Sequence, residues 1–146
     1  MGRLIFDTKN KADFDKKFSI ETIKEIQGEV KEAKDNYEDS DVHAVDKFLS
    51  FCSIWASVKA SIVQNIASKF IGGISVDLEE QYEFYTELYV AMLETDADAV
   101  KLIQTQEFIE VYDNDDEDKI YASFWEPKGL PSIEAMRYDN GWSEQV

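Results

Sequence analysis

Carboxylates that lack a basic neighbour are the residues of this chain best suited to chemistry or binding. Fifteen acidic side chains lie between Asp77 and Asp118, and Lys101 is the only basic residue among them. The rest of the 146 residues is nearly balanced in charge, so almost all of the net charge of −16 belongs to this one segment. A concentrated charge creates a local field that attracts a partner of opposite sign, whereas dispersed charge mainly keeps a protein soluble.

Two groups of these carboxylates have a spacing that suits contact with a basic surface. In a predicted helix that begins at Asp77, glutamates at i, i+3 and i+7 share one face, and no lysine lies four residues from any of them. A polar loop between two predicted strands supplies the second group. Carboxylates so placed on a helix are about 5–6 Å apart, which is similar to the spacing of phosphates along a nucleic-acid strand. The candidate partner-binding residues are Glu80, Glu83, Glu87, Asp113, Asp115, Asp116 and Glu117.

The sequence predicts no catalytic residue, no metal site and no cofactor. A calcium loop of the EF-hand type beginning at Asp113 would need Gly at its sixth position and Glu at its twelfth, where the chain has Asp118 and Phe124. The single histidine, His43, has no nucleophile at a recognisable spacing. The single cysteine, Cys52, lies on an apolar stripe and is expected to be an inert core thiol.

A third set of carboxylates, within residues 25–33 and 43–46, supports an alternative, enzymatic interpretation. Over roughly a third of the chain this pattern resembles the all-α nucleoside triphosphate pyrophosphatases of the MazG type, which carry EExxE followed by ExxD. Ile26 and His43 replace two carboxylates of that pattern. The resemblance implies a Mg²⁺ ion held between two helices. The implied ligands are Glu25, Glu29, Glu32 and Asp46.

Hydrophobic periodicity predicts a mainly helical (α+β) fold, in which a bundle surrounds a buried central helix and a β-hairpin follows near the C-terminus. Ser19 is a good N-cap for a first helix with an apolar stripe. Residues 41–71 are apolar nearly all round and precede Gly72-Gly73, so they are expected to form the central helix. The helix from Asp77 has a predicted buried stripe of Leu78, Tyr82, Tyr85, Tyr89 and Met92, widened by Phe84 and Leu88.

The remaining segments complete a single predicted domain, 1–146. A shorter helix is expected at 96–105, and β-rich runs at 108–112 and 120–125 indicate the hairpin. A helical turn is expected at 133–137. The predicted divisions are an N-terminal arm (1–18), a helical bundle (19–106), the hairpin (107–126) and a C-terminal tail (127–146).

Charge and hydropathy also predict the setting in which the chain works. The N-terminus lacks the apolar core of a signal peptide, and polar residues interrupt the most apolar stretch, so we expect a cytoplasmic protein that does not associate with membranes. An acidic protein is repelled by nucleic acid, so direct binding to it is not expected.

These features favour a non-enzymatic inhibitor or interaction protein that masks the basic surface of a partner, such as a nuclease or another nucleic-acid-binding protein. Nucleic-acid mimics, phage anti-defence inhibitors and immunity proteins share this description. The alternatives are the divergent pyrophosphatase, or an accessory subunit whose acidity only keeps it soluble.

Overall fold

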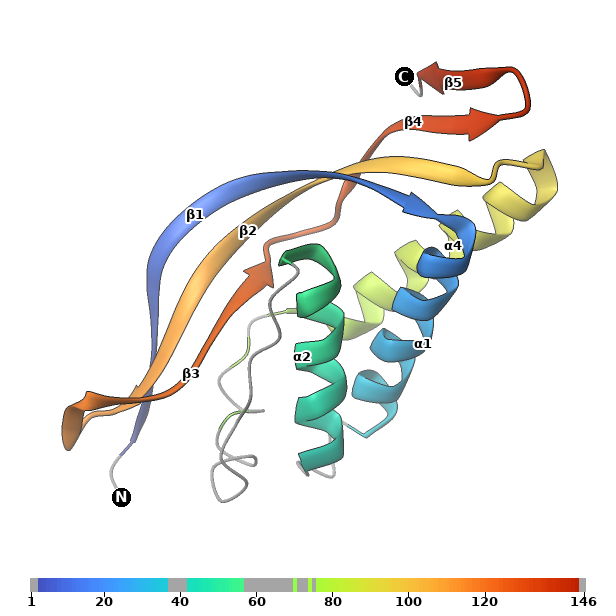
Figure 1. The fold of residues 1–146 in the computed structure, drawn as a ribbon. Coiled ribbons are helices and arrows are strands. Elements are labelled where there is room, and N and C mark those ends of the chain that lie inside the picture. The colour runs from blue at the N-terminus through green and yellow to red at the C-terminus, as the bar shows by residue number, and fades with distance from the viewer. Residues whose placement is uncertain (1–2, 37–41, 57–69, 71–73, 75, 145–146) are drawn as a thin grey trace.

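Five strands and three helices form the described part of the molecule. The computed structural model describes residues 3–36, 42–56, 70, 74 and 76–144. Strands β1 and β2 arch over the helices, which cover one face of the sheet (Figure 1). In chain order the elements are β1 (Leu4–Ser19), α1 (Ile20–Asp35), α2 (Val42–Ala56), α4 (Leu78–Thr95), β2 (Ala99–Asp113), β3 (Asp116–Pro127), β4 (Ser132–Tyr138) and β5 (Gly141–Glu144).

Strand β2 is the centre of an antiparallel sheet. On one side it pairs with β1 along its whole length, from Ser19 opposite Ala99 to Leu4 opposite Asp113. On its other side two strands divide the edge, because β4 pairs with the first part of β2 and β3 pairs with the last part. Strand β5 then pairs with β4. The β3–β4 connection therefore lies beside β2 at the point where its partner on this edge changes.

The predicted mainly helical bundle is wrong. The sheet is five-stranded and antiparallel, and in the described part of the chain its strands hold more residues than the helices do. The fold is a curved sheet with helices packed on one face. Among the described residues, no helix is both long enough and apolar enough to cross a membrane.

The predicted N-terminal arm is strand β1. Its inward positions include Phe14 and Phe18, but Lys16 also points inward, where its ammonium group donates to the backbone oxygens of Ile54 (2.8 Å) and Trp55 (3.1 Å). A charged residue at an inward position obscures the two-residue period that identifies a strand. The C-terminal end of α2 supplies the acceptors that make this position tolerable for lysine.

Two segments that were predicted to be helical are strands in the structure. Residues 96–105 were expected to be a helix, but β2 begins at Ala99 and buries Val100 and Leu102 on alternate positions. Polar Gln104 and Gln106 continue that buried face, so the apolar alternation ends early in the sequence. Residues 133–137, the other expected helical turn, belong to β4, where good helix formers pair with β2 and β5. Strand partners here outweigh local helix propensity.

The starts of two helices, predicted from their capping residues, are confirmed. The Ser19 side chain accepts from the Thr22 amide at the start of α1, and Asp77 accepts from the Glu80 amide at the start of α4. The predicted α4 stripe needs one correction, because Gln81 is buried, whereas Tyr82 and Tyr89 are only partly buried. Of the predicted central helix after Ala56, the structure describes only Phe70, which is buried; residues 57–69 and 71, with the glycine stop, lie outside the described residues.

Aromatic side chains join the helices to the sheet. The Phe18 ring on β1 contacts the Trp55 ring on α2 with centroids 4.8 Å apart, and Phe48 contacts Phe124 on β3 at 5.8 Å. The Trp55 indole N–H donates to the Tyr85 hydroxyl of α4 at 3.0 Å, in a fully buried site. Burial raises the pKa of Tyr85 well above its usual value, so the hydroxyl stays neutral.

We expect the substitution Tyr85→Phe to lower the free energy of unfolding by about 1–3 kcal/mol, because the Trp55 N–H would lose its acceptor in a dry site. Urea denaturation provides the measurement. Tyr89→Phe is the matched control, since Tyr89 lies on the same helix and is only partly buried; its cost should stay within about 0.5 kcal/mol. Equal costs for both variants would contradict the importance of this hydrogen bond.

Candidate functional site

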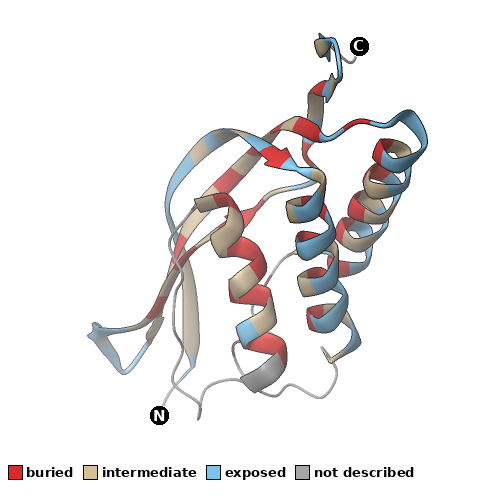
Figure 2. Ribbon diagram, turned by 45° about the vertical axis from the view of Figure 1, so that its right-hand side comes forward, coloured by how far each residue is buried: buried red, intermediate tan, exposed pale blue. Residues whose placement is uncertain are grey.

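Helix α4 presents a row of exposed glutamates on the side away from the sheet. Steps of three, four and seven residues separate them, so they lie on one face, nearly opposite the buried stripe. At 1.5 Å of rise per residue the row is about 20 Å long. Figure 2 shows the exposed outer faces of α1 and α4 beside each other. We define the α4 acidic stripe as Glu80, Glu83, Glu87 and Glu94, all exposed.

No basic side chain in the described part of the chain forms an ion pair with the α4 acidic stripe. Two lysines of the neighbouring helix α1 lie over tyrosine rings of α4 instead: Lys24 over Tyr89 at 5.9 Å and Lys34 over Tyr82 at 5.3 Å. Cations beside the helix are therefore held on aromatic faces. The field of the stripe stays uncompensated on its outer side.

Other carboxylates of the acidic segment do have cationic partners. Arg137 donates to Asp98 at 2.8 Å, and this hydrogen bond holds the pKa of the Asp98 carboxyl below its usual range. Lys128 lies 3.7 Å from Glu107. Lys101, the one basic residue of the segment, pairs instead with carboxylates outside it, 3.0 Å from Glu134 and 3.5 Å from Asp15. The basic residues near the start of β2 thus stabilise the sheet, and the concentration of charge predicted from the sequence survives on α4.

The second predicted group, at the β2–β3 turn, is separate from the stripe. Asp115 and Asp116 are exposed, but Asp113 is buried and its carboxylate accepts from the Asp115 amide at 2.8 Å. The side chain of Glu117 lies outside the described residues. Strand β2 leads from the C-terminal end of α4 to this turn, at the far end of the sheet (Figure 1). The predicted contact residues whose side chains are described therefore lie in two separate places, and Asp113 has a structural role in the turn.

An apolar groove borders the α4 acidic stripe. It has a volume of about 210 Å³ and lies between α4 and β4, with Phe84, Leu88, Ala91 and Ile133 as its apolar lining and Glu87 at its rim. Further along the exposed side of α4, Val90 and Leu93 are 44% and 52% exposed. Apolar side chains bordered by carboxylates have the composition of an interface centre with a charged rim.

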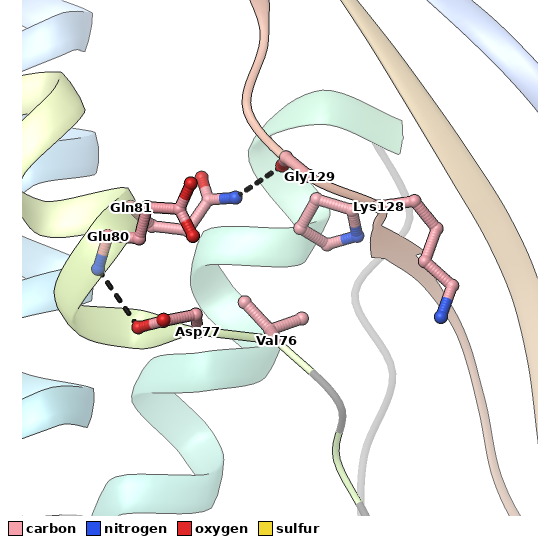
Figure 3. A pocket seen from close by; sticks show the side chains of 7 residues that line it. Val76, Asp77, Glu80, Gln81, Lys128 and Gly129 are labelled. Atoms are coloured by element: carbon pink, nitrogen blue, oxygen red, sulfur yellow. Dashed lines mark hydrogen bonds between the residues drawn. The ribbon is translucent and has the colours of Figure 1, made fainter.

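A polar pocket lies at the other end of the stripe, at the N-terminal turn of α4 (Figure 3). Its volume is about 140 Å³, and its lining residues are Val76, Asp77, Glu80, Gln81, Pro127, Lys128 and Gly129. The Gln81 amide donates to the Gly129 carbonyl oxygen at 2.7 Å, which ties α4 to the β3–β4 connection. Gly129 has φ +69°, a conformation that glycine adopts at little cost. Sequence reasoning missed this pocket; the only signal was a glutamine within an otherwise apolar helix face.

The carboxylates of the enzymatic alternative are arranged around a lysine. Lys47 of α2 lies 3.6 Å from Glu29 and 3.9 Å from Glu32, while Glu25 and Asp46 are exposed. Among the described residues, no group of three or more metal-ligating side chains is close enough to hold an ion. The antiparallel sheet also differs from the all-α architecture that the resemblance implies. Lys47 of α2 therefore joins the two helices through salt bridges to Glu29 and Glu32 of α1.

The chain's single cysteine and single histidine differ in what the structure describes of them. Cys52 is fully buried, and burial raises the pKa of its thiol, so it is an unreactive core residue as the sequence indicated. His43 belongs to the first turn of α2, and its side chain lies outside the described residues.

Comparisons with models of protein families, with curated proteins and with solved structures find no match to this chain.

We expect the substitution Glu83→Lys to raise the free energy of unfolding by about 0.5–1 kcal/mol at low salt, because it removes like-charge repulsion and adds i,i+4 pairs with Glu79 and Glu87. Urea denaturation of the variant and the parent checks this. The neutral control Glu83→Gln should give a smaller gain, and about 0.5 M salt should reduce both. An unchanged stability at low salt would mean that the stripe carries little repulsion.

Proposed function

We propose that this chain is a non-enzymatic, cytoplasmic interaction protein that masks the basic surface of a partner, as nucleic-acid mimics, anti-defence inhibitors and immunity proteins do. The observation that carries the proposal is the α4 acidic stripe, about 20 Å of exposed carboxylates without a described ionic partner. Because α1 lysines lie over tyrosine rings, the stripe is available to an external cation. The partner is a protein with clustered Lys or Arg, such as a nuclease or another nucleic-acid-binding protein.

The two components of the surface contribute in different ways. The acidic stripe steers a basic partner toward α4 and raises the association rate, and its effect falls as salt increases. The apolar groove between Phe84 and Ile133 then provides buried contact area that salt does not weaken. Exposed Leu93 and Val90, which do not line the groove, add apolar surface on the other side of the stripe. The partner therefore needs an apolar side chain among its basic residues.

The β2–β3 turn provides a second, smaller acidic contact through Asp115 and Asp116. Because the turn lies at the far end of the sheet from α4, one partner reaches both patches only if its basic surface follows the curve of the sheet (Figure 1). We assign the main contact to α4. The accessory-subunit alternative predicts salt-insensitive association through an apolar patch alone, and the next experiment separates the two.

The test is a pull-down with the tagged protein from a lysate of its source organism, washed first in low salt and then in about 0.5 M salt. A basic protein that is retained in low salt and released by the second wash is the expected result. The variant Glu80→Lys/Glu83→Lys/Glu87→Lys should lose it.

The matched control is Glu21→Lys/Glu25→Lys/Asp46→Lys, which makes the same change in net charge at exposed positions outside α4. This control should retain the same partner, with at most a modest loss. If both triple variants lose the partner equally, only net charge matters and the assignment to α4 is wrong. A partner that resists the salt wash and both variants would support the accessory-subunit alternative.

A further inference from the structure

Strand β1 leaves one long edge of the sheet open. Among the described residues it pairs only with β2, so the backbone N–H and C=O groups on its other side have no strand partner there. Residues 8–11, in the middle of the strand, are exposed, and Figure 2 shows pale blue along the arch of β1. An open edge of this kind accepts a further strand through backbone hydrogen bonds.

The charges in the middle of this edge are arranged about Ala12. Lys11 and Asp13 flank it and project from one face of the sheet, since alternate residues of a strand share a face. Both are exposed, and neither forms an ion pair within the described part of the chain. The Asp13 carboxylate accepts from the Thr105 hydroxyl group at 2.7 Å. A carboxylate has further acceptor sites, so Asp13 remains able to bind a cation.

This arrangement is complementary to itself. In an antiparallel pair of β1 strands related by a two-fold axis at Ala12, Lys11 of each copy lies opposite Asp13 of the other. Opposite residues of such a pair have Cβ atoms about 4.5–5.5 Å apart, so both symmetry-related ion pairs form directly. On the other face the same register places Asn10 opposite Phe14. The axis itself carries only the small side chain of Ala12.

Charged residues on an edge strand usually prevent such pairing, because most registers bring like charges together. A shift of the axis by one residue would place Lys11 or Asp13 opposite its own copy. A shift of two residues toward the N-terminus would place Lys9 opposite Lys11. The same shift toward the C-terminus would place Asp13 opposite Asp15. Of these registers, only the one centred on Ala12 brings no like charges together.

We propose that two copies of this chain associate through their β1 edges, antiparallel and centred on Ala12, so that one continuous sheet spans the dimer. Backbone hydrogen bonds provide the attraction, and the pairs between Lys11 and Asp13 determine the register. With four lysines and three aspartates, β1 is nearly neutral and does not oppose the approach of a second copy as the α4 acidic stripe would. Because two isolated strands are only marginally stable in water, the edge pairs once β2 holds β1 in place. This dimer does not depend on the masking function.

The test measures sedimentation velocity of the whole protein in about 0.15 M salt, where charges more than about 8 Å apart are screened. At about 100 μM, well above the micromolar dissociation constant of a weak interface, the parent protein should sediment as a dimer. Lys11→Asp and Asp13→Lys should each raise the dissociation constant at least about tenfold, since each creates two like-charge contacts across the axis. A monomeric parent protein, or a dimer that both variants leave intact, overturns the proposal.

The two single variants also test the register, because each supplies the charges that the other lacks. One has two acidic residues beside Ala12 and the other has two basic residues, so an equimolar mixture should form a heterodimer although each variant alone is monomeric. The double variant Lys11→Asp/Asp13→Lys should restore the homodimer. A mixture that remains monomeric, with both variants folded by circular dichroism, overturns the register.

A matched control separates this contact from a general effect of charge. Lys119→Asp makes the same change as Lys11→Asp at an exposed position of β3, which in the described structure also pairs only with β2. It should leave the dissociation constant within about twofold of the parent value. Net charge alone predicts opposite effects for Lys11→Asp and Asp13→Lys, whereas the proposed contact predicts a loss for both. Equal losses for Lys119→Asp and Lys11→Asp would overturn the assignment to β1.

Discussion

The antiparallel ladder between β1 and β2 is the interaction on which the other elements depend. All three described helices lie between these strands in sequence, so the pairing of Ser19 with Ala99 closes the helical part of the chain into one loop. At that closure the Ile20 amide donates to the Asp98 carbonyl at 2.9 Å. The start of α1 and the end of α4 therefore meet, the two helices run antiparallel, and the glutamates of α4 face away from the sheet.

This arrangement of strands and helices determines where the charge of the acidic segment lies. Ion pairs at Asp98 and Glu107 use part of it within the sheet, and the turn at Asp115 carries another part to the far end. What remains on α4 borders an apolar groove, so charge and apolar surface follow one helix. A partner that binds this helix meets both within a few turns.

Local signals in the sequence predicted the helix starts at Ser19 and Asp77 and the outward face of α4, because caps and the 3.6-residue period depend only on near neighbours. The strands were missed where inward positions carry Lys16 or Gln104, whose partners come from distant parts of the chain. The pocket was missed for the same reason, since Gln81 and the Gly129 carbonyl are 48 residues apart. Hydrogen bonds to distant parts of the chain stabilise these polar residues in the interior. A local sequence pattern cannot predict such bonds.

The wide separation of β1 and β2 in sequence also determines the order in which the protein can assemble during synthesis. Strand β1 leaves the ribosome first, and about 80 residues must follow before its partner is made. At roughly 5–20 residues per second, β1 waits on the order of 4–16 s with both edges unpaired. Its charged residues, including Lys9, Lys11 and Lys17, protect those edges from pairing with neighbouring nascent chains during that interval. These exposed charges thus serve the unfinished chain as well as the finished one.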